Sequence, residues 1–190
     1  MLGPDTEIDL ARAALLIAKT EYPDLNLERY LYRLKQLAAE ARAGRVELDP
    51  LRRLHRLREF LFEEAGFRGN VEEYFDPRNS FLNDVLDRKL GIPITLSLVL
   101  MEVGNRLGLD LQGIGLPAHF IVGVQIDGCQ ILLDPFHGGT LLTAEGAQEL
   151  VSRVLGRRVT LQEEHFTPVT KRQFLARMLT NLKAIYWRTG

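Results

Sequence analysis

The middle of the chain contains a mostly apolar run that restricts how the rest can fold. Residues 94–103 read ITLSLVLMEV, with Pro93 in front of them and Gly108 five residues after them. Proline is favoured at the first position of a helix and glycine just beyond its end. A helix that is apolar over most of its surface has to be buried. We therefore expect a central helix from Pro93 to about Leu107, with the other elements packed around it.

Three amphipathic segments precede this helix and predict an N-terminal unit of three helices over residues 1–66. Each segment has apolar residues at helical spacing and a capping residue or a first-turn proline near its start. We expect helices over residues 6–20, 26–44 and 49–66, begun by Thr6, Asn26 and Asp49-Pro50 and ended by Pro23, Gly44 and Gly66.

The third segment carries a cluster of arginines that needs an explanation. Arg52, Arg53, Arg56 and Arg58 are followed by glutamates at positions 59, 63 and 64. A nucleic-acid patch is one interpretation. Because the opposite charges recur at helical spacing, we favour an exposed face laced with salt bridges.

After the central helix the pattern changes from helical spacing to alternation. Asp127-Gly128 is a strong hairpin signal between two short runs. This change predicts an α+β fold, in which the central helix packs on a small antiparallel sheet. The expected elements are strands over residues 111–115, 119–126, 130–133 and 159–162, a helix from Thr143, and a last helix from Thr170 almost to the chain end. We divide the chain into a helical unit (1–66), a core (67–165) and a C-terminal helix (166–190).

Composition narrows the class of protein. Hydrophobic residues make up 46% of the chain and the net charge is −1, which favours a globular protein without a bias towards nucleic acid or membranes. The single cysteine, Cys129, excludes an internal disulfide framework and suits a reducing compartment. Beside the hairpin turn, Cys129 is expected to be a small strand residue. We expect a cytoplasmic protein with no signal peptide, no membrane-spanning segment and no cofactor.

One histidine and one aspartate are placed to form a catalytic pair. His119 begins one predicted strand and Asp134 ends its hairpin partner, eight residues before and six residues after the Asp127-Gly128 turn. Such residues can be neighbours across antiparallel strands. In nucleophilic catalysis a histidine acts as the base and a carboxylate fixes its tautomer. The alternative is a core histidine and an aspartate that only forms a turn.

Four phrases, in this order, resemble the SirB-type bacterial branch of the transglutaminase-like superfamily. They are YFDPRNSFLN (74–83), GIPITLS (91–97), PAHF (117–120) and LDPFHGG (133–139). The resemblance extends from about Asp5 to the chain end and implies a papain-like core with an N-terminal helical unit. In that family a tetratricopeptide-like region follows, and residues 179–186 resemble its beginning.

The resemblance assigns His119 as the base and Asp134 as the residue that orients it. Counting back from the end of the central helix places Pro93 where the superfamily has its nucleophilic cysteine. Proline carries no nucleophile. Ser97 lies one turn further along the same helix face. Its hydroxyl can either approach His119 or bond to the carbonyl of Pro93.

Three polar residues before the central helix are candidates for ligand binding. Asn79 and Asn83 would share one face of a short helix begun by Ser80, where they could donate hydrogen bonds into a cleft. Asn79 is equally well explained as the N-cap of that helix. Arg78 is a candidate anion-binding residue at the rim of the cleft.

A metal site is the other chemistry that the same stretch suggests. His137 follows Asp134 by three residues and, with His119, would complete a set of metal-binding side chains. No His-x-x-x-His motif or cysteine pair accompanies them. The sequence therefore favours no metal, with His137 as a turn residue, although its place next to the pair also makes it a candidate binding residue.

Three functions remain open at this stage. The favoured one is a non-catalytic transglutaminase-like module that binds an unknown protein or peptide, or serves as a scaffold, because Pro93 stands in the position of the cysteine. The second is a hydrolase or acyltransferase that uses Ser97, His119 and Asp134. The third is a metal-dependent hydrolase that uses His119, Asp134 and His137.

Overall fold

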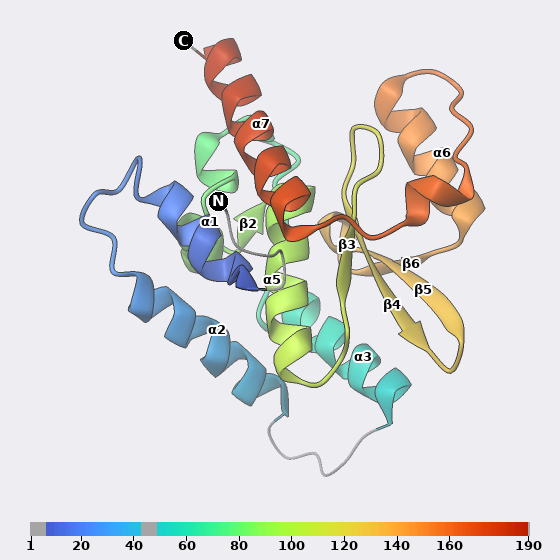
Figure 1. Cartoon of the computed structure of the whole chain (residues 1–190), viewed down its shortest axis with the longest axis horizontal. Helices are drawn as coiled ribbons and strands as arrows, with labels where there is room; N and C mark the ends of the chain where they lie inside the picture. Colours follow the sequence, from blue (N-terminus) through green and yellow to red (C-terminus); the bar gives the residue numbers. More distant parts are fainter. Residues whose placement is uncertain (1–6, 43–48, 190) are drawn as a thin grey trace.

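A computed structural model describes residues 7–42 and 49–189. The helix α5 lies at its centre, with α1 and α2 on one side and a four-stranded antiparallel sheet on the other (Figure 1). The strands follow one another in the order β3-β4-β5-β6. The helices are α1 (Leu10–Ala18), α2 (Leu27–Arg42), α3 (Pro50–Arg58), α4 (Leu82–Arg88), α5 (Pro93–Arg106), α6 (Ala144–Leu155) and α7 (Lys171–Thr189). The strands are β1 (Arg68–Gly69), β2 (Leu90–Gly91), β3 (Gln112–Ile114), β4 (Ile121–Ile126), β5 (Cys129–Asp134) and β6 (Thr140–Leu142).

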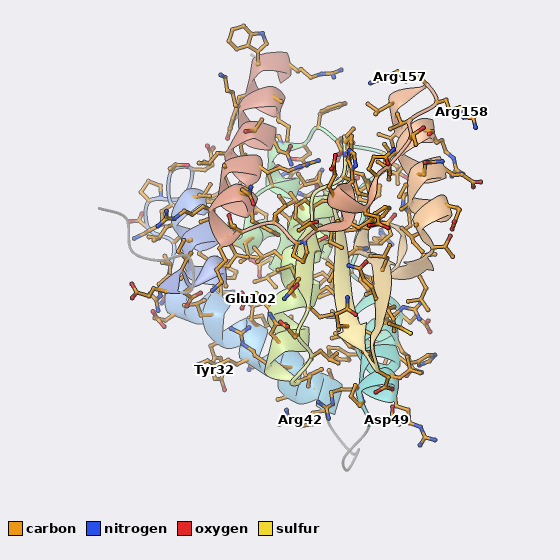
Figure 2. The ribbon with its side chains drawn as sticks, turned by 45° about the vertical axis from the view of Figure 1, so that its right-hand side comes forward. Tyr32, Arg42, Asp49, Glu102, Arg157 and Arg158 are labelled. Carbon is orange, nitrogen blue, oxygen red and sulfur yellow. The ribbon has the colours of Figure 1, made fainter. Side chains whose placement is uncertain are left out.

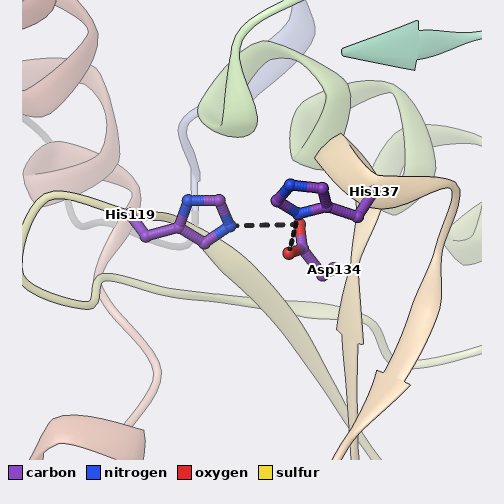
Figure 3. Close-up of side chains that lie close together, drawn as sticks. All are labelled: His119, Asp134 and His137. Carbon is purple, nitrogen blue, oxygen red and sulfur yellow. Dashed lines mark hydrogen bonds and ion pairs between the residues drawn. The ribbon is translucent and has the colours of Figure 1, made fainter. Parts of the chain in front are cut away.

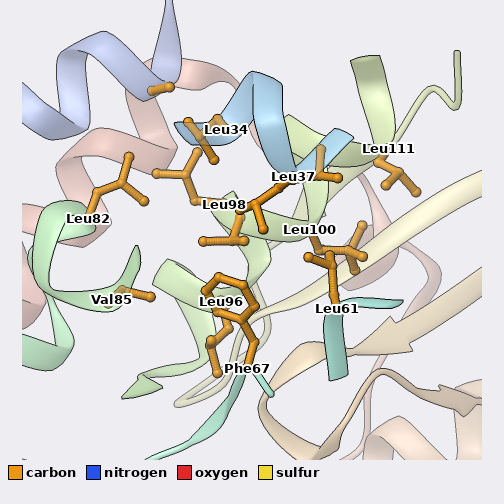
Figure 4. Close-up of a cluster of buried hydrophobic side chains, with 14 of the residues drawn as sticks. Leu34, Leu37, Leu61, Phe67, Leu82, Val85, Leu96, Leu98, Leu100 and Leu111 are labelled. Atoms are coloured by element: carbon orange, nitrogen blue, oxygen red, sulfur yellow. The ribbon is translucent and has the colours of Figure 1, made fainter. Parts of the chain in front are cut away.

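The central helix begins and ends at the predicted residues. Pro93 is its first residue, and the Thr95 hydroxyl accepts the N–H of Ile92 at 3.1 Å. Gly108, with φ +78°, follows its end. Most of its side chains are buried, among them Leu96, Leu98 and Leu100. These leucines pack among buried side chains of the surrounding elements (Figure 4), including Leu34 and Leu37 of α2, Leu82 and Val85 of α4, Leu61, Phe67 and Leu111.

The N-terminal helices match the prediction in number, with corrections at their ends. The first is shorter than expected, because Asp9 caps it by accepting the N–H of Arg12 at 2.9 Å. The predicted cap Thr6 and the predicted stop Gly44 lie outside the described residues. Asn26 and Asp49 cap α2 and α3 as expected, through side-chain bonds to Arg29 and Arg52.

The third predicted helix changes character part-way. The α-helix α3 ends at Arg58, and a π-helical segment, Glu59–Glu64, continues it towards Gly66. The arginine cluster is used within the chain: Arg56 pairs with Glu59 and Glu64, and Arg58 donates to the carbonyl of Gly139 at 2.6 Å. The predicted salt bridges are therefore confirmed for Arg56, but its side chain is only 11% exposed, so the expected exposed face is wrong at this residue.

The sheet forms around the predicted hairpin. Asp127 and Gly128 adopt φ of +51° and +78°, as a type I′ turn requires. One face of the sheet, with Val122 and Leu133, packs towards α5, while Ile121 and Leu132 on the other face pack with α6. Successive residues of a strand point to opposite faces, so this two-sided burial follows from the strands themselves.

Two predictions in this region were wrong. Residues 159–162 do not form a strand, and Thr140–Leu142 form β6, which pairs with β5 and was not expected. The backbone of Val159 and Leu161 is instead bonded to the side chains of Ser152 and Gln148.

The last helix packs back on the N-terminal part of the chain. Leu182 of α7 is buried with Ala18 of α1 and Phe81, and the Tyr186 hydroxyl donates to Glu21 at 3.0 Å. Charged and polar side chains such as Tyr32, Asp49, Arg157 and Arg158 project outward from the fold (Figure 2). Within the described ranges, no helix is both long and apolar enough to cross a bilayer.

Candidate functional site

A small cavity lies where the N-terminus of α5 meets the loop before β4. Its volume is about 60 Å³, and Pro93 and His119 both line it. Tyr74 reaches it from the segment before α4, and Arg177 and Asn181 reach it from α7. The cavity therefore brings together four parts of the chain that are separated in sequence.

The predicted pair of His119 and Asp134 is formed. His119 was expected to begin β4 but lies two residues before it. Asp134 ends β5, as expected. The His119 Nε2 lies 3.1 Å from Asp134 Oδ1, and both side chains are buried (Figure 3). Asp134 Oδ1 also accepts the backbone N–H of Phe136 at 3.0 Å.

Asp134 is held in its ionised form by its neighbours. Burial alone would raise the pKa of this carboxyl, but hydrogen bonds from His119 and His137 outweigh it and bring the pKa well below its usual range. The carboxylate can therefore accept an N–H hydrogen bond from each histidine. This fixes the proton of neutral His119 on Nε2 and leaves Nδ1 as the nitrogen available to a ligand.

His137 forms a second bond to the same carboxylate. Its Nδ1 lies 2.6 Å from Asp134 Oδ2, and its ring stacks at 6.0 Å from that of His119 (Figure 3). The hydrogen bond to Asp134 raises the pKa of His137. His137 lies in the 3-10 turn Pro135–His137, as the prediction of a turn residue had it.

The same three side chains are the donors available for a metal ion. One donor atom from each of His119, Asp134 and His137 lies within 4.8 Å of the other two. Two imidazoles and a carboxylate suit a divalent transition metal. Both oxygens of Asp134 already accept bonds from the histidines, so a metal would have to replace those contacts.

Pro93 and His119 line the same cavity. That Pro93 takes the place of the superfamily's nucleophilic cysteine stays a prediction. Ser97, one turn further along, is completely buried and its Oγ has no hydrogen-bond partner. Neither of the two alternatives for Ser97 is therefore formed: its Oγ bonds neither to the carbonyl of Pro93 nor to His119.

The asparagines before α5 have different surroundings. Asn79 does not cap α4. That helix begins at Leu82, and its N-cap residue is Phe81, which makes no side-chain capping bond. Its side chain instead donates to the carbonyl of Glu73 at 2.7 Å and accepts from Asn70 at 3.0 Å. Its own carbonyl accepts the Thr95 hydroxyl at 2.7 Å. Asn79 thus fixes the start of α5, and its side-chain oxygen and nitrogen are both hydrogen-bonded within the protein.

Asn83 and Arg78 complete the predicted binding set. Asn83 is buried in α4, and its Oδ1 has no hydrogen-bond partner. It does not share a helix face with Asn79, because Asn79 lies in the preceding 3-10 turn, Pro77–Asn79. Arg78 is exposed and pairs with Asp76 at 2.7 Å. Cys129 lies at the start of β5 as expected, but it is exposed.

Comparison with known proteins decides the family. Residues 28–180 match the family model of the transglutaminase-like superfamily. The chain belongs to the transglutaminase-like superfamily. It is 38% identical over 191 residues to a UPF0162 protein of Xylella fastidiosa (strain 9a5c), covering 98% of this chain and 68% of the relative. It is 32% identical over 183 residues to a UPF0162 protein of Vibrio cholerae, covering 95% and 67%.

The superfamily domain also links this chain to a larger eukaryotic protein. This chain is 30% identical over 138 residues to F-box only protein 21 of Mus musculus, and the match covers 68% of this chain and 21% of that protein. No solved structure gives a significant match. The finer SirB-type assignment and the tetratricopeptide-like continuation stay predictions.

Three cavity residues were missed by the sequence analysis. Tyr74 falls inside a phrase that resembles the family, but nothing in its spacing marks it as part of a site. Arg177 and Asn181 lie one turn apart on α7, 58 residues or more beyond His119. Only the packing of α7 against the loop before β4 brings them to the site.

Proposed function

We propose that this chain is a non-catalytic transglutaminase-like module that binds a peptide segment of a partner protein in the cleft at Pro93 and His119. The observation that carries the proposal is the position of Pro93. His119 is bonded to Asp134 and shares its cavity with Pro93, whose side chain has no nucleophilic atom. A cleft that keeps its polar groups without its nucleophile is suited to binding.

The state of Ser97 supports this choice over a serine hydrolase. A serine nucleophile needs a hydrogen bond to its base and access to substrate. Ser97 has an exposed fraction of 0%, and its Oγ has no partner. The two requirements for catalysis are both unmet.

The first prediction concerns a thiol placed at position 93. In a Cys129→Ser background, which removes the exposed native thiol, Pro93→Cys should give a thiol with a pKa at least about one unit below the ordinary value of about 8.5. The reason is that the helix N-terminus and His119 both favour a thiolate there. The pH dependence of alkylation by iodoacetamide measures this pKa.

The matched control adds His119→Ala to the same protein. It should return the thiol most of the way to its ordinary pKa, because the base is gone. A thiol of ordinary pKa in the presence of His119 contradicts the idea that the site lacks only its nucleophile.

The second prediction tests binding itself. Peptides selected on the wild-type chain from a random displayed library should bind at least about tenfold more weakly to Asn181→Trp, because the indole fills the cavity that Asn181 lines. Asn181 is half-buried on the regular helix α7, so the helix can carry a tryptophan. The control is Lys183→Trp, an exposed position of the same helix. Fluorescence anisotropy of the labelled peptides gives the affinities.

Equal binding to both variants would show that the peptides use another surface. Turnover of a peptide or acyl substrate by the wild-type chain would refute the non-catalytic proposal.

A further inference from the structure

The cavity at Pro93 contains a cation with no counter-charge. Arg177 lines it, and no carboxylate of the described residues lies within 4.0 Å of its guanidinium. Burial lowers the pKa of Arg177, yet an arginine keeps its charge in proteins. A partly buried charge without a partner is unfavourable. The site is therefore suited to an anion that residues 7–42 and 49–189 do not supply.

The guanidinium is fixed in place by the protein. One of its terminal nitrogens donates to the carbonyls of Leu116 and His119, at 2.6 and 2.8 Å. The guanidinium also lies over the ring of Phe120, 5.7 Å from its centre. These contacts orient Arg177 through one nitrogen and leave donors of the planar fork for a ligand.

Other polar atoms that line the cavity have no hydrogen-bond partner in the described part of the chain. His119 is 4% exposed and its Nε2 is taken by Asp134, while Nδ1 makes no hydrogen bond to any described residue. The same holds for the Tyr74 hydroxyl and the Asn181 side chain, which line the same space. Burial raises the pKa of Tyr74, so its hydroxyl stays a donor. Arg177, Tyr74 and Asn181 thus offer hydrogen-bond donors to one small volume, whereas Nδ1 of neutral His119 is an acceptor.

The start of α5 adds a favourable field. Ile92, its N-cap, provides no side-chain hydrogen bond, and Ile94 in the first turn lines the cavity. The N-terminus of a helix carries partial positive charge, which favours an anion. Here it adds to Arg177 and does not form the site alone.

We propose that the cavity binds a carboxylate carried by a peptide, either its C-terminus or an Asp or Glu side chain, with Arg177 as the principal ligand. A volume of about 60 Å³ holds such a group but no large side chain. The planar guanidinium matches the two oxygens of a carboxylate. The proposal rests on the peptide-binding function given above and specifies the chemical group that the cleft receives.

The experiment titrates the wild-type chain with N-acetylglycine and with N-acetylglycinamide, which lacks the carboxylate. NMR shifts of the Ile94 amide and the His119 ring report on the cavity. The acid should bind at least about tenfold more tightly than the amide. Propionate and inorganic phosphate complete the series, and phosphate should bind more weakly than the acid.

A matched pair of variants assigns the binding to one residue. Arg177→Gln should weaken binding of the acid at least about tenfold, and Lys183→Gln on the same helix should leave it unchanged. Thermal unfolding of each variant establishes that it is folded. The comparison of acid with amide in the wild-type chain does not depend on how Arg177→Gln folds.

The outcomes separate this inference from the function on which it rests. Equal affinity for acid and amide, or tighter binding of phosphate, overturns the carboxylate proposal while peptide binding stands. The carboxylate proposal is also overturned if the selected peptides bind in the cleft without needing a carboxylate. Failure of both the small acids and the peptide selection overturns both proposals.

Discussion

Asp134→Ala should destabilise the protein by about 3–5 kcal/mol, because it takes the acceptor from three hydrogen-bond donors at about 1–3 kcal/mol each. The substitution leaves His119 Nε2 and the backbone N–H of Phe136 buried without an acceptor, and it removes the partner of His137. In a chain of this length such a loss lowers the melting temperature by about 10 °C or more. Thermal and urea unfolding measure it.

Two companion variants separate the causes. Asp134→Asn keeps an acceptor oxygen of the same shape and should lose less stability than Asp134→Ala. Asp110→Ala removes an exposed aspartate whose side chain, among the described residues, bonds only to Gln112, and its effect should be close to zero. An effect of Asp134→Ala as small as that of Asp110→Ala would mean that the cluster does not stabilise the fold.

The difference in the free energy of unfolding between wild type and Asp134→Ala should decrease both at low pH and at high pH. Because the pKa of Asp134 is lowered by folding, its contribution is complete above its unfolded pKa of about 3.9 and is lost as the pH falls towards the folded value. Because the pKa of His137 is raised, the contribution of that pair is complete below about pH 6.5 and is lost as the pH rises through the folded value. The difference should therefore be largest between about pH 4 and 6.5.

Gly69→Ala should destabilise the protein by about 1–3 kcal/mol or more through a clash beneath the site. A methyl group at Gly69 would lie 2.6 Å from the carbonyl oxygen of Phe136 and 2.7 Å from its ring. A backbone atom cannot move aside as the end of a flexible side chain can. The 3-10 turn that carries His137 would have to shift, and the NMR signal of the Phe136 amide, which bonds to Asp134, should report that shift.

The same change at Gly146 serves as the control. Gly146 lies in α6, and a methyl group there meets its nearest atom at 3.5 Å, an ordinary contact. Gly146→Ala should be neutral or stabilise by up to about 1 kcal/mol, because alanine favours a helix over glycine. If both variants unfold at the same temperature, β1 does not pack against the turn as described.

Local signals account for the parts of the fold that could be predicted. Pro93 and Gly108 mark the ends of α5 because their backbone preferences act within one turn, and Asp127-Gly128 determines the hairpin for the same reason. The hairpin then brings His119 and Asp134 together, so this pair could be predicted by counting residues. Each of these inferences needed only neighbours in the sequence.

The predictions of secondary structure fail where side chains from another element form the hydrogen bonds of the backbone. Residues 159–162 have a β-like pattern, but Ser152 and Gln148 of α6 take up their hydrogen bonds and no strand pairing is needed. Gly138 and Gly139 adopt φ of +70° and +68° and turn the chain back into β6, which was not expected. Tyr74, Arg177 and Asn181 could not be placed in the site, because tertiary packing alone brings them there.

The position of Arg177 on the last helix has a consequence for the order in which the protein matures. Synthesis proceeds from the N-terminus, so His119, Asp134 and the start of α5 leave the ribosome before Arg177 does. Until α7 packs, the carbonyls of Leu116 and His119 lack their shared donor, and the cavity lacks the wall that α7 supplies. A nascent chain therefore cannot have its complete cavity before α7 has been synthesised and has packed against the loop before β4.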